Sequence, residues 1–159
     1  MTRRVLLGTG AAVVAGAAAI VGARLTHRLD DVADAVGLEP KPQPDPEDTR
    51  IARAAGRDAA VLLATVEATA AAHRGLELEP IVAICREHTS ALSAPTVAPG
   101  SPPPGDASAA ADALADVVQA ASTARAVDAG TAASPELARV LASMSAGLAQ
   151  AARGVRRLR

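Results

Sequence analysis

The stretch SPELARVLASMSAGLAQAARGVRRL, residues 134–158, decides the fold of this protein. It opens on Ser134, Pro135 and Glu136, which are a helix-capping residue, a first-turn proline and an early acid. Apolar residues then recur at spacings of three and four, which places them on one face of a helix. They are Leu137, Leu141, Met144, Leu148, Ala151, Val155 and Leu158. Because one helix cannot bury such a face by itself, the stretch predicts a helical bundle.

Three upstream segments show the same helical period. They run over about 48–73, from Pro80 to a proline-rich loop over 93–105, and from Asp106 or Ser108 to about Gly130. Their apolar stripes are Ile51, Ala55, Ala59, Leu62, Val66, Thr69 and His73; Ile81, Ile84, Cys85, His88 and Leu92; and Leu114, Val117, Val118, Ala121 and Ala124. The sequence therefore predicts an all-α protein, with an antiparallel four-helix bundle over 48–159.

The composition excludes several classes of function. The chain has no Phe, Tyr or Trp, so it lacks the rings on which single-stranded nucleic acids stack. Its 16 basic residues are matched by 17 acidic ones, which leaves no excess of positive charge for duplex DNA. A single cysteine excludes a disulfide scaffold. We therefore expect no nucleic-acid partner.

Residues 1–23 have the layout of an export signal. Arg3 and Arg4 precede an uncharged run over 5–23, which ends on small residues and predicts cleavage after Ala23. The paired arginines resemble a twin-arginine translocation signal, although Gly8 stands where that pattern often has Lys. The alternative is an uncleaved membrane anchor, because 19 helical residues can just span a bilayer of about 30 Å.

A short spacer is predicted between this signal and the bundle. Residues 24–36 carry apolar side chains at helical spacing, and Gly37 would end that short helix. Proline then occupies every second position from Pro40 to Pro46, which denies the backbone the donors that a helix needs. We interpret 24–47 as a short helix followed by an extended proline-rich linker.

Two segments of the bundle resemble the ferritin-like domain of exported bacterial proteins. They are EHTSAL at 87–92 and PELARVLASMSA at 135–146, which flank a proline-rich loop, and the resemblance extends over roughly 48–158. It implies a four-helix bundle related to iron-binding ferritins. A di-iron centre of that kind uses two Glu-x-x-His pairs, and this sequence contains none. Leu148 and Ala151 stand where the resemblance would place a carboxylate and a His, so we expect the metal ligands to be lost.

Three residues are the remaining candidates for metal chemistry: His73, Cys85 and His88. The two histidines could meet across the first two helices, and with the thiol they would suit zinc or copper. The fourth ligand is missing, so we favour partly buried, hydrogen-bonded histidines beside a buried thiol. Cys85 and His88 also lack the third group that orients a nucleophile pair. We therefore expect no catalytic residue, no metal and no cofactor.

The sequence predicts an exported, non-catalytic module with a structural or interaction role in the periplasm or cell envelope. Its expected partners are the twin-arginine export machinery and an unknown cell-envelope protein, with membrane contact through 5–23. One alternative is a membrane-tethered helical adaptor that keeps its N-terminal helix, and another is a divergent metal-binding ferritin relative.

Overall fold

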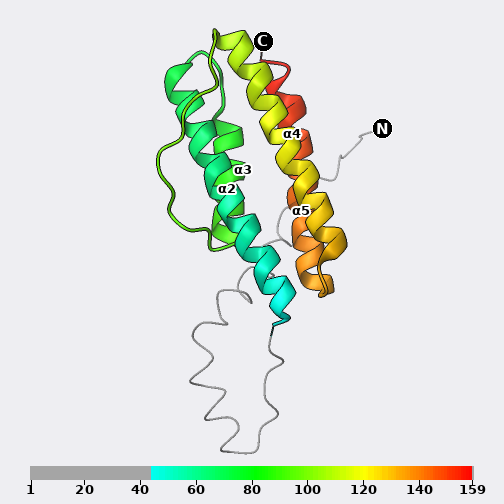
Figure 1. Ribbon diagram of the computed structural model, residues 1–159. Helices are drawn as coiled ribbons and strands as arrows, with labels where there is room; N and C mark the ends of the chain where they lie inside the picture. The colour runs from blue at the N-terminus through cyan, green and yellow to red at the C-terminus, as the bar shows by residue number, and fades with distance from the viewer. Residues whose placement is uncertain (1–43, 159) are drawn as a thin grey trace, which may run out of the picture. The chain divides into compact units, whose positions relative to one another are not determined.

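The structure is a computed structural model that describes residues 44–158. The predictions for the export signal and for most of the spacer concern residues 1–43 and so lie outside the described residues. The described part contains four helices and no strand: α2 (Pro46–Ala72), α3 (Glu79–Ala91), α4 (Ala107–Thr131) and α5 (Pro135–Val155) (Figure 1). The all-helical prediction is confirmed for this part of the chain.

Side-chain caps explain where three of the helices begin. Asp106 Oδ1 accepts from the amide of Ala109 at 2.9 Å, and Ser134 Oγ accepts from that of Leu137 at 3.4 Å, so both expected caps are confirmed. Asp45 Oδ1 accepts from the amide of Glu47 at 2.7 Å. The first helix of the bundle therefore begins at Pro46, two residues before the predicted start.

The four helices form two hairpins. α2 and α3 run in opposite directions and are joined by a short turn, and the same is true of α4 and α5 (Figure 1). The connection from α3 to α4 is longer and returns along the outside of α2, so α3 and α4 point the same way (Figure 1). α4 packs most extensively on α5, and α2 packs on α3. Further contacts join α2 to α4 and α3 to α5.

The core consists of two hydrophobic clusters. The first joins the C-terminal half of α2 to α3, to the N-terminal half of α4 and to the end of α5; its largest members include Leu62, Val66, Leu78, Ile81, Val82, Leu114, Val118, Leu148 and Val155. The second joins the start of α2 to the start of α5 and consists of Ile51, Ala55, Ala59, Leu92, Leu137, Leu141 and Met144. The stripes predicted over 48–73 and 134–158 are thus the buried faces of α2 and α5, apart from His73 and Leu158, which are partly exposed.

The predicted stripe of α4 is partly wrong. Val117 is 43% exposed and Ala124 is also exposed, whereas Ser122 and Arg125 are buried. Leu114, Val118, Ser122 and Arg125 follow one another at spacings of four, four and three, so they share one helix face. The apolar pattern alone selected a neighbouring face, because Ala and Val occur all around this helix.

The contact between α4 and α5 is stabilised by a pair of reciprocal hydrogen bonds. Ser122 Oγ donates to the carbonyl of Ser145 at 2.8 Å, and Ser145 Oγ donates to the carbonyl of Ser122 at 2.8 Å. Side chains this short can reach the opposite backbone only where the two helices are close together. Ala115 of α4 and Ala152 of α5 are also fully buried, in the first hydrophobic cluster.

Two further contacts hold connecting segments against α2: the turn before α5 and the proline-rich connection between α3 and α4. The buried Asp48 accepts from the amides of Ala133 at 2.7 Å and Ser134 at 2.9 Å, and so joins the start of α2 to the turn before α5. Gly100 lies against the backbone of Ala64, where an added Cβ would come within 2.4 Å of the Ala64 carbonyl carbon. The proline-rich connection therefore packs directly on α2.

The arginines at the end of α5 have local roles. Arg153 lies in the last turn, where a cation complements the helix dipole. Arg156 forms an ion pair with Asp116 of α4 at 2.8 Å, and Arg157 is exposed. None of the helices described between residues 46 and 155 is long and apolar enough to cross a membrane.

Candidate binding cavity

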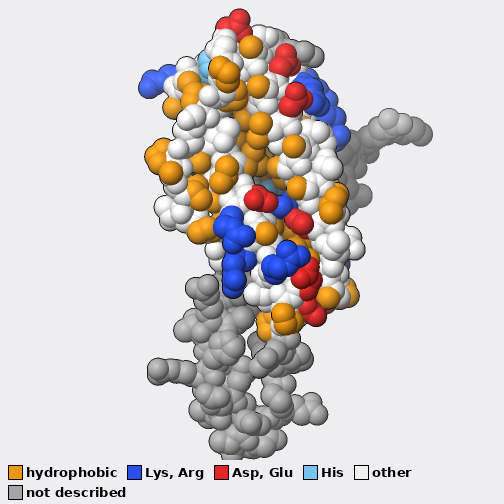
Figure 2. Space-filling view, in the orientation of Figure 1, with side chains coloured by type: hydrophobic (Ala, Val, Ile, Leu, Met, Phe, Trp, Pro, Cys, Tyr) orange, Lys and Arg blue, Asp and Glu red, His pale blue; other side chains and the backbone are white. Residues whose placement is uncertain are grey.

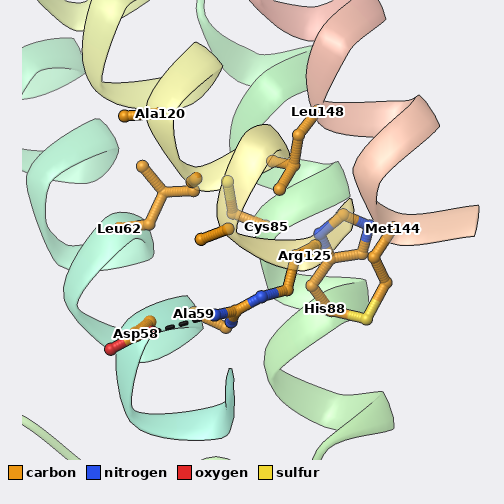
Figure 3. Close-up of a pocket in the computed structure, with 11 residues that line it drawn as sticks. Asp58, Ala59, Leu62, Cys85, His88, Ala120, Arg125, Met144 and Leu148 are labelled. Carbon is orange, nitrogen blue, oxygen red and sulfur yellow. Dashed lines mark hydrogen bonds and ion pairs between the residues drawn. The ribbon is translucent and has the colours of Figure 1, made fainter. Parts of the chain in front are cut away.

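A cavity of about 210 Å³ lies among the four helices, where the two hydrophobic clusters meet. Leu62, Met144 and Leu148 form its apolar wall together with several alanines. Its polar lining residues are Asp58 of α2, Cys85 and His88 of α3, and Arg125 of α4 (Figure 3). Figure 2 shows hydrophobic side chains along the junction of α2 and α4, with a group of acidic and basic side chains below them.

Arg125 is the central polar residue of the cavity. Its side chain is 6% exposed and extends from α4 to α2, where Nη1 donates to the carbonyl of Ala55 at 3.0 Å (Figure 3). Nη2 pairs with Asp58 at 2.9 Å and with Asp128 at 2.8 Å. Among the described residues, Arg125 Nε is a buried donor without a hydrogen-bond partner. The guanidinium charge is thus neutralised, but one of its donors is unused.

His88 lies on the opposite side of the cavity from Asp58, close to Met144 (Figure 3). Burial lowers the pKa of His88 below its ordinary value of 6.5; nearby Glu87 opposes that shift and Arg125 adds to it. Its imidazole is therefore neutral at pH 7. On the α5 side the ring faces Gly147, where an added Cβ would be 3.8 Å from His88 Nε2.

Cys85 is a buried thiol with little reactivity. Burial, together with the negative charge of Glu67, raises the pKa of Cys85 to about 11. Because the thiolate is the nucleophile and the metal ligand, a thiol of this kind is inert at neutral pH. The structure does bring Cys85 and His88 to one cavity, but it gives the pair no means of activation.

His73 does not join the other two candidate ligands. It caps the C-terminus of α2, where its amide donates to the carbonyl of Thr69 at 2.9 Å. His88 instead faces the part of α2 that contains Asp58 and Leu62. Leu62 is eleven residues before His73, or about 16 Å along a helix. The hypothesis that His73 and His88 meet is therefore wrong, because both lie toward the C-terminal ends of helices that run in opposite directions.

The one carboxylate of the cavity lining, Asp58, already pairs with Arg125. Over residues 44–158 no group of three or more His, Cys, Asp or Glu side chains is arranged to hold a metal ion. The expected absence of a metal centre remains a prediction for the whole chain.

Sequence reasoning missed Asp58 and Arg125. Arg125 could have been found, because it continues the spacing of Leu114 and Val118 on a helix otherwise rich in Ala. Asp58 carried no such signal, since it is 64% exposed and its partner is 67 residues away in the chain.

Comparison of the chain with family models, with curated proteins and with solved structures finds no match.

Proposed function

We propose that this protein is an exported, non-catalytic helical-bundle module that acts outside the cytoplasm by binding. The observation that carries the proposal is the chemistry of the cavity. Its one thiol has a raised pKa, its one imidazole is neutral, and its carboxylate belongs to an ion pair with Arg125. A nucleophilic mechanism needs an activated nucleophile and an oriented base, and these groups supply neither.

A ferritin-like relationship is supported by the order and direction of the helices. Ferritin-like bundles have one long crossover between their two hairpins, and the connection between α3 and α4 here is of that kind (Figure 1). A carboxylate-bridged metal pair would need several inward acids, because buried charges are costly unless a metal or a cation pairs with them. The inward residues at mid-bundle include Leu62, Val118 and Leu148, which favours a ferritin-like module without a metal centre.

Export rests on the sequence of the N-terminus alone. The twin-arginine machinery distinguishes Arg from Lys, because guanidinium and ammonium groups bind their partners with different geometry. We expect that replacing both Arg3 and Arg4 with Lys stops export of the full chain, as measured by cell fractionation. Replacing exposed Arg53 and Arg57 with Lys is the matched control and should leave export unchanged. Undiminished export of the first variant would contradict the twin-arginine proposal.

N-terminal sequencing of the exported protein separates the proposal from a membrane-tethered adaptor. A mature chain that begins at Arg24 supports release into the periplasm or cell envelope. An intact N-terminus that fractionates with the membrane supports the adaptor, with 5–23 as its anchor.

A further inference from the structure

The cavity between α2 and α4 has a size and a lining that suit a small organic molecule. Its volume is about 210 Å³. Apolar cavities of roughly 150 Å³ in proteins hold a benzene molecule, so a six-membered ring with one substituent fits here. Leu62, Met144 and Leu148 would contact the hydrocarbon part of such a ligand.

The charges around the cavity disfavour an ionic ligand. Asp58 and Asp128 already pair with Arg125, so the guanidinium offers no free positive charge to an anion. A bound cation would face the same guanidinium, and Asp58, the one carboxylate of the lining, is mostly exposed and already pairs with it. The other polar lining groups, Cys85 and His88, are uncharged at neutral pH. A charged molecule would therefore lose its hydration without a compensating ion pair.

One polar atom of the lining indicates what the ligand must carry. Arg125 is 95% buried, lines the cavity, and has no hydrogen-bond partner for Nε among residues 44–158. Buried donors in folded proteins are almost always paired. We therefore expect this N–H to donate to an acceptor that is not among the described residues. The close-up shows the Arg125 side chain crossing the cavity between α2 and His88 (Figure 3).

From these observations we infer that the cavity binds a small, uncharged, mostly hydrocarbon molecule with one acceptor oxygen, such as a ketone or an ether, which accepts a hydrogen bond from Arg125 Nε. The inference rests on the proposed function in one respect, that the cavity binds its ligand and does not transform it. It is independent of export, so a failure of ligand binding and a failure of export would be seen in separate experiments.

The test compares four probes of one shape on the purified full-length protein: cyclohexanone, methylcyclohexane, cyclohexanecarboxylate and cyclohexylammonium. Binding is measured by titration calorimetry and by the NMR shift of the Met144 methyl group. We expect saturable binding of cyclohexanone, about threefold to tenfold tighter than methylcyclohexane, which corresponds to one net hydrogen bond. The two ions should bind at least about tenfold more weakly than the ketone, since neither finds a free counter-charge.

A matched pair of variants tests the location of the site without disturbing the core. Ala124 and Ala126 are both exposed on α4, but only Ala124 lines the cavity. Ala124→Leu should weaken cyclohexanone binding at least about tenfold by filling the cavity, and Ala126→Leu should leave it unchanged. Equal binding by the two variants, equal affinity for the ketone and the hydrocarbon, or no saturable binding of any probe would overturn the inference.

Discussion

The helices of this alanine-rich chain pack differently at two contacts. One is the contact between α4 and α5, and the other is the contact between α2 and α4. Between α4 and α5, Ser122 and Ser145 exchange hydrogen bonds with each other's backbone, and small residues let the helices approach closely. Between α2 and α4, the long side chain of Arg125 reaches across and a cavity remains beside it. Small side chains let two helices approach closely, whereas the long side chain of Arg125 joins two helices across a gap and leaves a cavity beside it.

The largest loss of stability is expected at the contact between α4 and α5. Ser122→Leu inserts a branched side chain where α4 and α5 lie together and removes the exchanged hydrogen bonds. We expect a loss of about 3 kcal/mol in the free energy of unfolding, because overpacking and an unpaired carbonyl act together. Urea denaturation measures it. Thr123→Leu, at the next and exposed position, is the control and should change stability by less than about 0.5 kcal/mol. Equal stability of the two variants would show that the contact between α4 and α5 is loose.

A smaller loss is expected at the contact between α2 and α4. Arg125→Met keeps the length of the side chain but removes its bonds to Ala55 and Asp58 and its ion pair with Asp128. Because Asp58 is mostly exposed, water replaces much of what it loses, and we expect about 2 kcal/mol of destabilisation. Thermal or urea unfolding measures this, with exposed Arg57→Met of α2 as the control. A variant as stable as the wild type would mean that Arg125 contributes to specificity or binding alone.

The smallest effect concerns the pH dependence of stability. The pKa of His88 is lowered in the folded state, so below about pH 6.5 the unfolded chain takes up its proton more readily than the folded chain. The contribution of His88 to the free energy of unfolding is therefore fully present above pH 6.5 and declines as the pH falls toward the folded-state pKa. His88→Gln should flatten this decline in urea unfolding between pH 7 and pH 5. His73→Gln, which changes a partly exposed residue, should preserve it; the same slope in both variants would remove His88 as its cause.

The ends and buried faces of two helices were predictable from the sequence because they depend on neighbouring residues. Ser134 caps α5 and Asp106 caps α4. Thr69 Oγ1 donates to the carbonyl of Thr65, one turn earlier, at 2.7 Å, so its hydroxyl is satisfied on the buried face of α2. The buried face of α4 was harder to predict, because Ala and Val residues occur all around this helix. Only the burial of Ser122 and Arg125 identifies the inner face. The separation of His73 from His88 could also have been predicted, since successive antiparallel helices place their C-termini at opposite ends.

By itself, the sequence determined that the described part of the chain is all-α and, to within two residues, where its helices begin. Capping, propensity and apolar periodicity act within a few residues and do not require the rest of the chain. Only the tertiary structure decided that Arg125 meets Asp58, that two serines join α4 to α5, and that a cavity remains where the two hydrophobic clusters meet. These features depend on which helix faces lie together, and an alanine-rich helix offers several nearly equivalent faces until its long and polar side chains select one.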